Sequence, residues 1–282
     1  MGRIEKVFAD GKKPAFIGFT VAGDPDKITS VRIARALIAG GTDILELGVP
    51  FSDPVADGPT IQKADERALG AGTTPFTVFE IVREIRKESD VPIVLLTYYN
   101  IVYHRGIERF YHEAHDAGID GILIADMPVE ESEDVCENAL RFGIDPVFLV
   151  SQTTSDKRIK KIAAKARGYL YLVAVLGVTG VRDQISDEAI DLLNRVRRHT
   201  ALPLAIGFGI STPAQAQTCA RAGADGVIVG SAIVEIVERN LEDPDMMGRE
   251  LKGFVSAMKK AIVKDHPPYN LFTDDIFYYR TI

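Results

Sequence analysis

Eight short runs rich in valine, isoleucine and leucine recur along the chain and constrain its fold more than any other feature. They are nearly continuous in hydrophobicity, which is typical of parallel strands that are covered on both faces. Stretches with helical spacing of apolar residues separate them and begin near Ile28, Thr77, Ile107 and Glu133. This order of strand, helix, strand, helix predicts an α/β protein with a parallel sheet. The runs cover residues 14–21, 43–49, 92–99, 121–126, 145–151, 169–177, 203–210 and 226–230.

Eight such units in 282 residues predict a single (β/α)8 TIM barrel, a fold that usually takes about 250 residues. An open doubly wound sheet is the alternative, but the count of eight and the lack of a dinucleotide fingerprint after the first run disfavour it. We expect one domain over residues 1–282, with the barrel at about 14–264 and a C-terminal tail at about 265–282. We also expect an extended loop after the second strand and a short extra helix at the eighth.

Two pairs of residues give the clearest helix starts. Thr212 and Pro213 supply an N-cap and a first-turn proline, and Gln215 completes a capping box. Thr74 and Pro75 open another helix in the same way. These signals support the predicted alternation of helices and strands.

The charge balance and the cysteines narrow the function classes. Lys and Arg total 33 against 40 Asp and Glu, and the net charge of −7 argues against nucleic acid or an anionic membrane as the main partner. Cys136 and Cys219 sit in amphipathic stretches as buried small side chains. His112 and His115 are spaced like a helical pair but lack a third ligand, so we expect no metal site. The opening segment has no apolar signal core, and we expect a cytoplasmic protein.

Glu46 lies near the end of the second run, between Leu45 and Leu47. Because side chains alternate along a strand, Glu46 points away from both leucines. If the leucines pack outward against helices, Glu46 points into the barrel, where desolvation raises its pKa toward the range useful for acid and base chemistry. A buried structural glutamate paired with a basic group is the alternative, and the residue alone does not separate the two.

Asp57 follows Glu46 in the polar loop SDPVADGP, which also contains Asp53. Aspartate before glycine or proline commonly forms a turn, so either residue taken alone is a turn former. The long loop places Asp57 beside Glu46, where two carboxylates in different environments can take separate roles. This placement makes Asp57 the second candidate catalytic residue.

Three glycine-rich segments follow the sixth, seventh and eighth runs, at residues 177–180, 207–210 and 230–231. A single Gly-x-Gly is usually a turn. Three at successive strand ends favour a phosphate site, because barrel enzymes often bind phosphate with the loops after strands seven and eight and a short extra helix. Ser231 would start that helix and offer backbone N–H groups to the anion.

The run LELGVPFSDPVADGPTIQ closely resembles the signature of the tryptophan synthase alpha chain family. Further segments resemble that family in the same chain order, so the resemblance spans about residues 14 to 235. The sequence departs from the family at Val175 and Leu176, where better-known members carry serine and arginine. We therefore expect the loop after strand six to close with different contacts. The further matching segments are PAFIGFTVAGDP, LLTYYN, ILIADMPVEES, GVTG and IGFGIST.

The resemblance implies retro-aldol cleavage of indole-3-glycerol phosphate to indole and glyceraldehyde 3-phosphate, a step of tryptophan biosynthesis. Glu46 would be the general acid and base, and Asp57 would stabilise the indole ring nitrogen as the ring is protonated. Thr179 would orient Asp57. The residues implied around the phosphate are Gly180, Gly209, Gly230 and Ser231.

The resemblance also implies an apolar slot for the indole ring and a partner subunit. Asp53, Asn100 and Pro128 match positions at or near the interface with the β subunit, which would receive the indole in an α2β2 complex. Pyridoxal phosphate is expected only in that subunit, and no cofactor is expected in this chain. The slot residues are Phe19, Tyr98, Leu123, Tyr171 and Phe208, each of which could instead be ordinary barrel packing.

Three other functions stay open on the sequence. Another phosphate-binding barrel, such as an isomerase or aldolase, would have the same fold, although no strand-end lysine suggests Schiff-base chemistry. A regulatory barrel that activates a β subunit without turnover would not need the intact Glu46 and Asp57. A free-standing lyase that releases indole without a partner would share all the catalytic residues.

Overall fold

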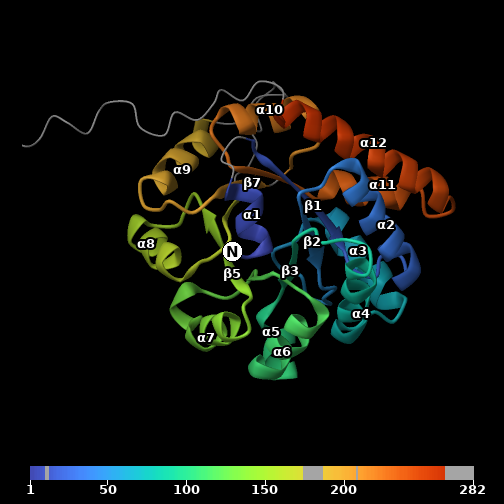
Figure 1. Cartoon of the computed structure of the whole chain (residues 1–282), viewed down its shortest axis with the longest axis horizontal. Helices are drawn as coiled ribbons and strands as arrows, with labels where there is room; N and C mark the ends of the chain where they lie inside the picture. The colour runs from blue at the N-terminus through green and yellow to red at the C-terminus, as the bar shows by residue number, and fades with distance from the viewer. Residues whose placement is uncertain (10–12, 174–186, 208, 264–282) are drawn as a thin grey trace, which may run out of the picture.

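The strands of the computed structural model close into a barrel. The structure describes residues 1–9, 13–173, 187–207 and 209–263, so the predicted tail lies outside the described residues. Each of the eight parallel strands pairs with the next along the chain, and β8 pairs with β1. Helices form a ring around the strands (Figure 1). The predicted (β/α)8 barrel is confirmed, and the open sheet is excluded.

Every observed strand lies within one of the eight predicted runs. Residues 174–177, at the end of the sixth run, lie outside the described residues. The strands are β1 (Ala15–Val21), β2 (Ile44–Gly48), β3 (Ile93–Thr97), β4 (Gly121–Ile124), β5 (Asp145–Ser151), β6 (Leu170–Val173), β7 (Leu204–Gly207) and β8 (Gly226–Val229).

The strands divide most of their apolar side chains between two cores, and Phe19 and Val21 of β1 belong to a smaller third cluster. Leu45 and Leu47 of β2 belong to the large core between the strands and the surrounding helices. Ile44 belongs to a smaller core inside the barrel, together with Leu123 and Tyr169. The period of two along each strand produces this division, and it explains why the strands are apolar on both faces.

The four helical stretches predicted from apolar spacing are all present, as α2, α4, α6 and α7. The long α12 packs against α2 and α10 on the outside of the barrel. The ring consists of α2 (Lys27–Gly40), α4 (Pro75–Arg86), α6 (Ile107–Ala117), α7 (Glu133–Arg141), α8 (Asp156–Lys165), α9 (Asp187–Arg197), α10 (Pro213–Arg221) and α12 (Pro244–Val263).

Both predicted helix starts are confirmed as capping boxes. The Thr212 side chain accepts from the Gln215 backbone N–H, and the Gln215 side chain accepts from the Thr212 backbone N–H. Thr74 makes the same exchange with Thr77. Each box satisfies backbone groups that a helix end otherwise leaves without a partner, which fixes where α4 and α10 begin.

Four further helices and one turn complete the described fold. The extended loop after β2 holds α3 (Pro59–Gly70), and the predicted extra helix after β8 is α11 (Ser231–Arg239). The short α5 (Tyr99–Arg105) follows β3, and the 3-10 turn η1 (Val129–Glu131) follows β4. The fourth helix is α1 (Arg3–Ala9), which was not predicted.

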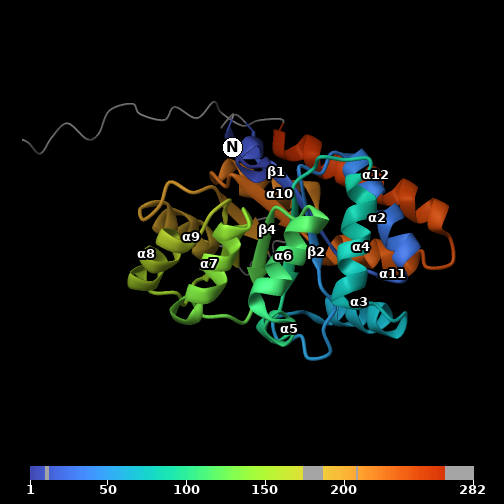
Figure 2. The same cartoon turned by 60° about the horizontal axis from the view of Figure 1, so that its bottom comes forward.

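The helix α1 closes one end of the barrel. Its Ile4 is fully buried in the inner core, and Arg3 donates to Asp120 at 3.1 Å. Figure 2 shows α1 at one end of the barrel and α3 and α5 at the other. The open end is the one to which the carboxyl ends of the strands point, where enzymes of this fold carry their active sites.

Candidate active site

Strand β2 places Glu46 inside the barrel, as predicted. The side chain is fully buried, while its neighbours Leu45 and Leu47 pack outward. The Tyr169 hydroxyl donates to Glu46 Oε1 at 2.6 Å. The second oxygen, Oε2, is buried and has no hydrogen-bond partner among the described residues. Glu46 therefore has one oxygen anchored by a hydrogen bond and one buried oxygen without a partner among the described residues.

Burial decides the charge state of Glu46. Loss of hydration raises the pKa of the carboxyl to about 7, against a smaller opposing effect of the hydrogen bond from Tyr169. The acid and the carboxylate are then both populated near neutral pH. A group in that balance can donate a proton and take one back, as general acid and base catalysis requires.

Asp57 lies on the loop after β2 and is held by Tyr98. The Tyr98 hydroxyl donates to Asp57 Oδ2 at 2.6 Å and accepts from the Ala56 N–H at 3.2 Å. The ring of Phe51 stacks on that of Tyr98, with 4.9 Å between centroids. Gln62 of α3 donates to the Asp57 backbone oxygen at 2.8 Å. These contacts fix the carboxylate at the open end of the barrel.

The two carboxyls have different surroundings. Asp57 is half-buried, and burial raises its pKa above the usual aspartate value against a smaller lowering effect of the Tyr98 hydrogen bond. Burial and the neighbouring Asp57 charge both raise the pKa of Tyr98, so this hydroxyl stays protonated and keeps donating. Glu46 is fully enclosed and can be neutral, whereas Asp57 reaches solvent and has a fixed donor. Such a difference allows separate catalytic roles.

Four of the five predicted slot residues lie inside the barrel or at its open end. Leu123 and Tyr171 belong to the inner core or pack against it. Phe19 of β1 lies beside Glu46 in strand register, and Tyr98 follows β3. Phe208 lies outside the described residues. The described four therefore lie in the same part of the barrel as the two carboxyls, and their role as a slot for an aromatic ligand stays a prediction.

The predicted phosphate residues are placed in part. Gly230 is the N-cap of α11 and has no side chain to accept from the first N–H groups of the helix. Ser231 is the exposed first residue of that helix. The first hydrogen bonds of α11 run from Ile233 and Val234 to the Gly230 oxygen, so the N–H groups before them point out of the helix end. Gly209 has a φ of 77°, which favours glycine. Thr179 and Gly180 lie outside the described residues.

The three residues expected at a partner interface follow neighbouring strands. Asp53 and Asn100 are exposed, and Pro128 is half-buried. They follow β2, β3 and β4 respectively, so all three lie at the open end of the barrel. Val175 and Leu176, where the sequence departs from the family, lie outside the described residues.

The two histidines have aromatic and ionic neighbours. The His112 ring lies against Phe142 with 5.6 Å between centroids, and its Nε2 is 3.6 Å from Asp116. His115 also lies against Phe142, at 6.5 Å. Among the described residues, no three histidine, cysteine, aspartate or glutamate side chains are grouped to hold a metal ion.

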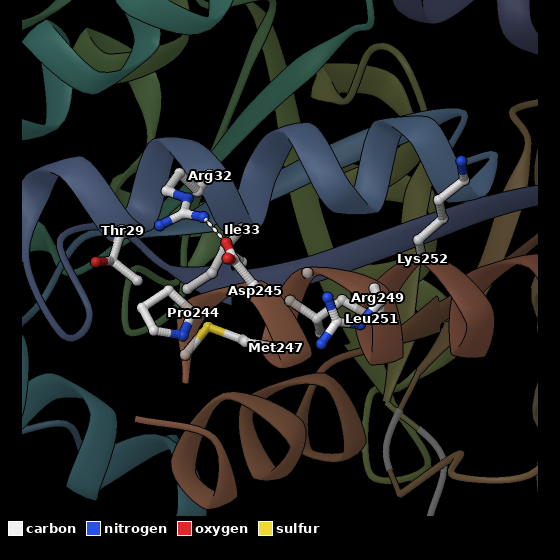
Figure 3. A pocket seen from close by; sticks show the side chains of 10 residues that line it. Thr29, Arg32, Ile33, Pro244, Asp245, Met247, Arg249, Leu251 and Lys252 are labelled. Atoms are coloured by element: carbon white, nitrogen blue, oxygen red, sulfur yellow. Dashed lines mark hydrogen bonds and ion pairs between the residues drawn. The ribbon is translucent and has the colours of Figure 1, made fainter. Parts of the chain in front are cut away.

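A groove on the outer surface lies apart from the two carboxyls. Residues of α2 and α12 line it, and Arg32 pairs with Asp245 across it (Figure 3). Neither Glu46 nor Asp57 contributes to its wall, so we do not assign the groove to the active site. Within the described residues, no helix is long and apolar enough to cross a bilayer.

Sequence reasoning missed three residues that shape this site. Tyr169 was only part of an apolar run, because its meeting with Glu46 depends on the register of strands far apart in the chain. Phe51 was part of the loop signature without a role of its own. Asp65 of α3 is a buried carboxyl that stands on the apolar face of its helix, a pattern that the sequence does display.

Comparison with known proteins identifies the family. The family model for the tryptophan synthase alpha chain matches residues 6–263. The alpha chain of Methanoregula boonei is 70% identical over 261 residues, which are 93% of this chain and 98% of that one. The alpha chain of Salmonella paratyphi B is 46% identical over 265 residues, with 93% and 99% covered.

Solved structures agree with the sequence matches. A tryptophan synthase a2b2 complex from Pyrococcus furiosus superposes with a TM-score of 0.82 at 40% identity, covering 88% of this chain and 98% of that one. The tryptophan synthase subunit alpha of Legionella pneumophila gives 0.85 at 34% identity, with 93% and 98% covered. The chain therefore belongs to the tryptophan synthase alpha chain family, whose enzymes cleave indole-3-glycerol phosphate.

Proposed function

We propose that Glu46 is the general acid and base of indole-3-glycerol phosphate cleavage in this chain, and that Asp57 stabilises the charge on the indole ring. The observation that carries the proposal is the contrast between the two carboxyls. Glu46 is enclosed in the barrel with a pKa of about 7, and Asp57 is fixed by Tyr98 at the open end of the barrel. Cleavage of indole-3-glycerol phosphate needs both a group that carries protons and a negative charge that stabilises the cationic ring.

The reaction breaks the bond between indole C3 and the side-chain carbon that bears a hydroxyl. Glu46 in its acid form gives its proton to C3, and the ring becomes an indolenine cation. The resulting carboxylate then takes the hydroxyl proton. The C–C bond breaks, its electron pair returns to the ring, and the carbon–oxygen bond becomes a carbonyl. Indole and glyceraldehyde 3-phosphate leave, and Glu46 is protonated again.

Asp57 acts on the charge that appears during this step. The substrate ring is neutral and the intermediate is a cation, so a carboxylate near the ring nitrogen favours the intermediate over the substrate. The hydrogen bond from Tyr98 keeps the carboxylate from rotating away, and it supplies no positive charge that would cancel the effect. This is the differential stabilisation that accelerates a reaction.

The phosphate would lie at the start of α11. Its uncapped first turn offers N–H groups and the positive end of the helix dipole, with Gly230 and Ser231 closest. Gly209, together with Gly180 and Thr179, would complete the surroundings, as the family resemblance implies. A Cβ on Gly230 would lie 3.0 Å from the Phe19 ring, so the phosphate end adjoins the aromatic slot.

The substitution Glu46→Gln tests the acid and base assignment. The amide keeps the size of the side chain and can still accept from Tyr169, but it cannot carry a proton between C3 and the hydroxyl. We expect indole release to fall by a factor of about 1,000 or more while substrate still binds, because loss of the proton carrier acts on the chemical step. Glu137→Gln, at an exposed position of α7, should remain active. An active Glu46→Gln enzyme would refute the assignment.

The chain would pass its indole to a β subunit. The Pyrococcus furiosus relative forms an a2b2 complex, which supports the same assembly here. Exposed apolar side chains flank the expected interface positions: Val55 follows Asp53 in its loop, and Tyr103 is one helical turn after Asn100. Large exposed apolar residues that gather at one end of a protein favour an interaction surface.

Two measurements test the partner. Addition of a β subunit should raise the rate of indole release, because partner binding would order the loops at the open end of the barrel. Tyr103→Ala should weaken the complex, and Leu140→Ala, at another exposed apolar position, on α7, should not. Full activity without a partner that stays unchanged when the β subunit is added would instead favour a free-standing lyase.

Two smaller assignments complete the proposal. The cleavage described above uses only side chains of this chain, and pyridoxal phosphate is expected in the β subunit. Cys136 and Cys219 are free and buried, which suits a reducing compartment and supports a cytoplasmic location.

A further inference from the structure

Asp65 is a buried carboxyl that the proposed reaction does not use. It stands on the face of α3 that packs into the protein, in line with Ile61, Ala64 and Ala68. Only 4% of the residue is exposed. Its Oδ2 is buried and has no hydrogen-bond partner among the described residues. An ionised carboxylate in such a position costs much more free energy than a neutral acid.

A chain of contacts joins Asp65 to Asp57. Gln62, one helical turn before Asp65 on α3, donates to the Asp57 backbone oxygen at 2.8 Å. The backbone of Phe51, at the start of the loop after β2 that carries Asp57 (the catalytic loop), is near enough to lower the pKa of Asp65. The Phe51 ring stacks on Tyr98, and the Tyr98 hydroxyl donates to Asp57. Asp65 therefore lies beside the loop and the ring that hold the carboxylate of Asp57.

Within the part of the chain that the structure describes, no cation forms an ion pair with Asp65. The guanidinium of Arg67, two residues later on the same helix, makes two hydrogen bonds to Asp24, at 2.7 and 2.8 Å. Arg67 also lies 3.7 Å from Glu238 of α11, the helix that packs against α3. The charges of Asp57 and Asp24 both raise the pKa of Asp65, and the charge of Asp65 in turn raises the pKa of Tyr98.

We propose that Asp65 takes the single proton of a carboxyl pair with Asp57 and thereby leaves Asp57 negatively charged. This inference deepens the proposed function and rests on Asp57 being the charge that stabilises the indole ring. Two nearby carboxyls cannot both ionise freely, and the proton goes to the one with the poorer environment. Asp57 has a donor and access to water, whereas Asp65 has an unpartnered oxygen on an apolar helix face.

The electrostatics around α3 agree with this geometry. Burial, followed by the charge of Asp57, raises the pKa of Asp65 to about 8, and the backbone of Phe51 opposes them. Asp65 is then neutral at neutral pH. Its ionisation at higher pH would set two negative charges against each other and push the catalytic loop from its position. Asp65 is thus a positioning residue that acts through Asp57 and Phe51.

Carboxyl titration by NMR in the whole chain, with 13C only in aspartate, tests the pair without substrate. We expect one signal to titrate near pH 8, to vanish in Asp65→Asn, and to move down by about one pH unit in Asp57→Asn, because the repelling charge is gone. Asp53→Asn, an exposed change in the same loop, should leave the signal in place. A signal of Asp65 that titrates below about pH 5, or that ignores Asp57→Asn, would overturn the proposal.

Kinetics supply a second readout that a merely structural role would not move. Asparagine resembles the neutral acid and cannot ionise, so the ratio of kcat/KM in Asp65→Asn to that in the wild type should rise several-fold from about pH 7 to about pH 9. A ratio that does not depend on pH would count against the carboxyl pair. Asp57→Asn separates the two proposals: if it remains active, the catalytic role of Asp57 fails, whatever the titration shows.

Discussion

The burial that suits Glu46 for catalysis should also make the protein less stable as the pH rises. The folded protein binds the Glu46 proton more tightly than the unfolded chain does, because burial raises the pKa of this carboxyl from 4.5 to about 7. Between these two values the unfolded chain releases its proton and the folded protein keeps it. The free energy of unfolding therefore falls as the pH rises through this range, and the loss is complete above about 7.

The size of this loss follows from the pKa difference. One pKa unit corresponds to about 1.4 kcal/mol, so a rise from 4.5 to about 7 corresponds to about 3 kcal/mol. Because Glu46 is fully buried, solvent screening does not reduce this value much. Against a total stability of about 5 to 15 kcal/mol for a typical protein, the penalty is large enough to measure.

Denaturant unfolding of Glu46→Gln and the wild type at about pH 4.5 and about pH 8.5 isolates this penalty. Glutamine cannot ionise, so the free energy of unfolding of the variant relative to that of the wild type should rise by up to about 3 kcal/mol between the two pH values. Any cost of the amide itself is the same at both and cancels. A relative free energy that stays constant, or that falls as the pH rises, would refute the claim that the folded barrel holds Glu46 as a neutral acid.

Two further substitutions test the surroundings of the carboxyls. Tyr169→Phe removes the hydrogen bond that lowers the pKa of Glu46, so the midpoint of the pH–rate profile should move up by about one unit, while Tyr171→Phe should leave it unchanged. Gly230→Ala places a Cβ 3.0 Å from the Phe19 ring, so KM for the substrate should rise several-fold with a smaller change in kcat, and an unchanged KM would contradict the assigned phosphate end.

The barrel could be predicted from the sequence because the physics that defines it is local. Each strand is apolar on both faces, and each helix that follows has its own apolar stripe, so the alternation is visible without any long-range contact. The helix α1 was not predicted because the contact that holds it is long-range. Ile4 packs into the inner core only in the closed barrel, and its neighbours Arg3 and Glu5 look like an ordinary polar terminus.

The candidate site could be predicted in part for the same reason. The direction of Glu46 follows from strand alternation, but its partner Tyr169 comes from a strand more than one hundred residues later, and only the register of the closed barrel brings the two together. The roles of Glu46 and Asp57 came from resemblance, since each residue alone had an ordinary structural explanation. Asp65 was visible as a carboxyl on an apolar helix face, yet its significance depends on Asp57 lying nearby.

The ion pair between Arg67 and Asp24 should hold α3 against the loop after β1. Asp24 is fully buried, and two hydrogen bonds at 2.7 and 2.8 Å join it to Arg67. Arg67→Ala would leave that carboxylate buried without a partner, a change that typically costs about 3 to 5 kcal/mol of folding stability. Because α3 also carries Asp65, the catalytic loop should loosen as well.

The exposed pair of Arg32 and Asp245 provides the matched control for Arg67→Ala. Its side chains are 46% and 73% exposed, so solvent screens the attraction, and Arg32→Ala should cost less than about 1 kcal/mol. Denaturant midpoints of the two variants measure the difference. If both variants lose the same stability, the buried pair does not support the position of α3, and the helix must be held to the barrel mainly by its apolar face.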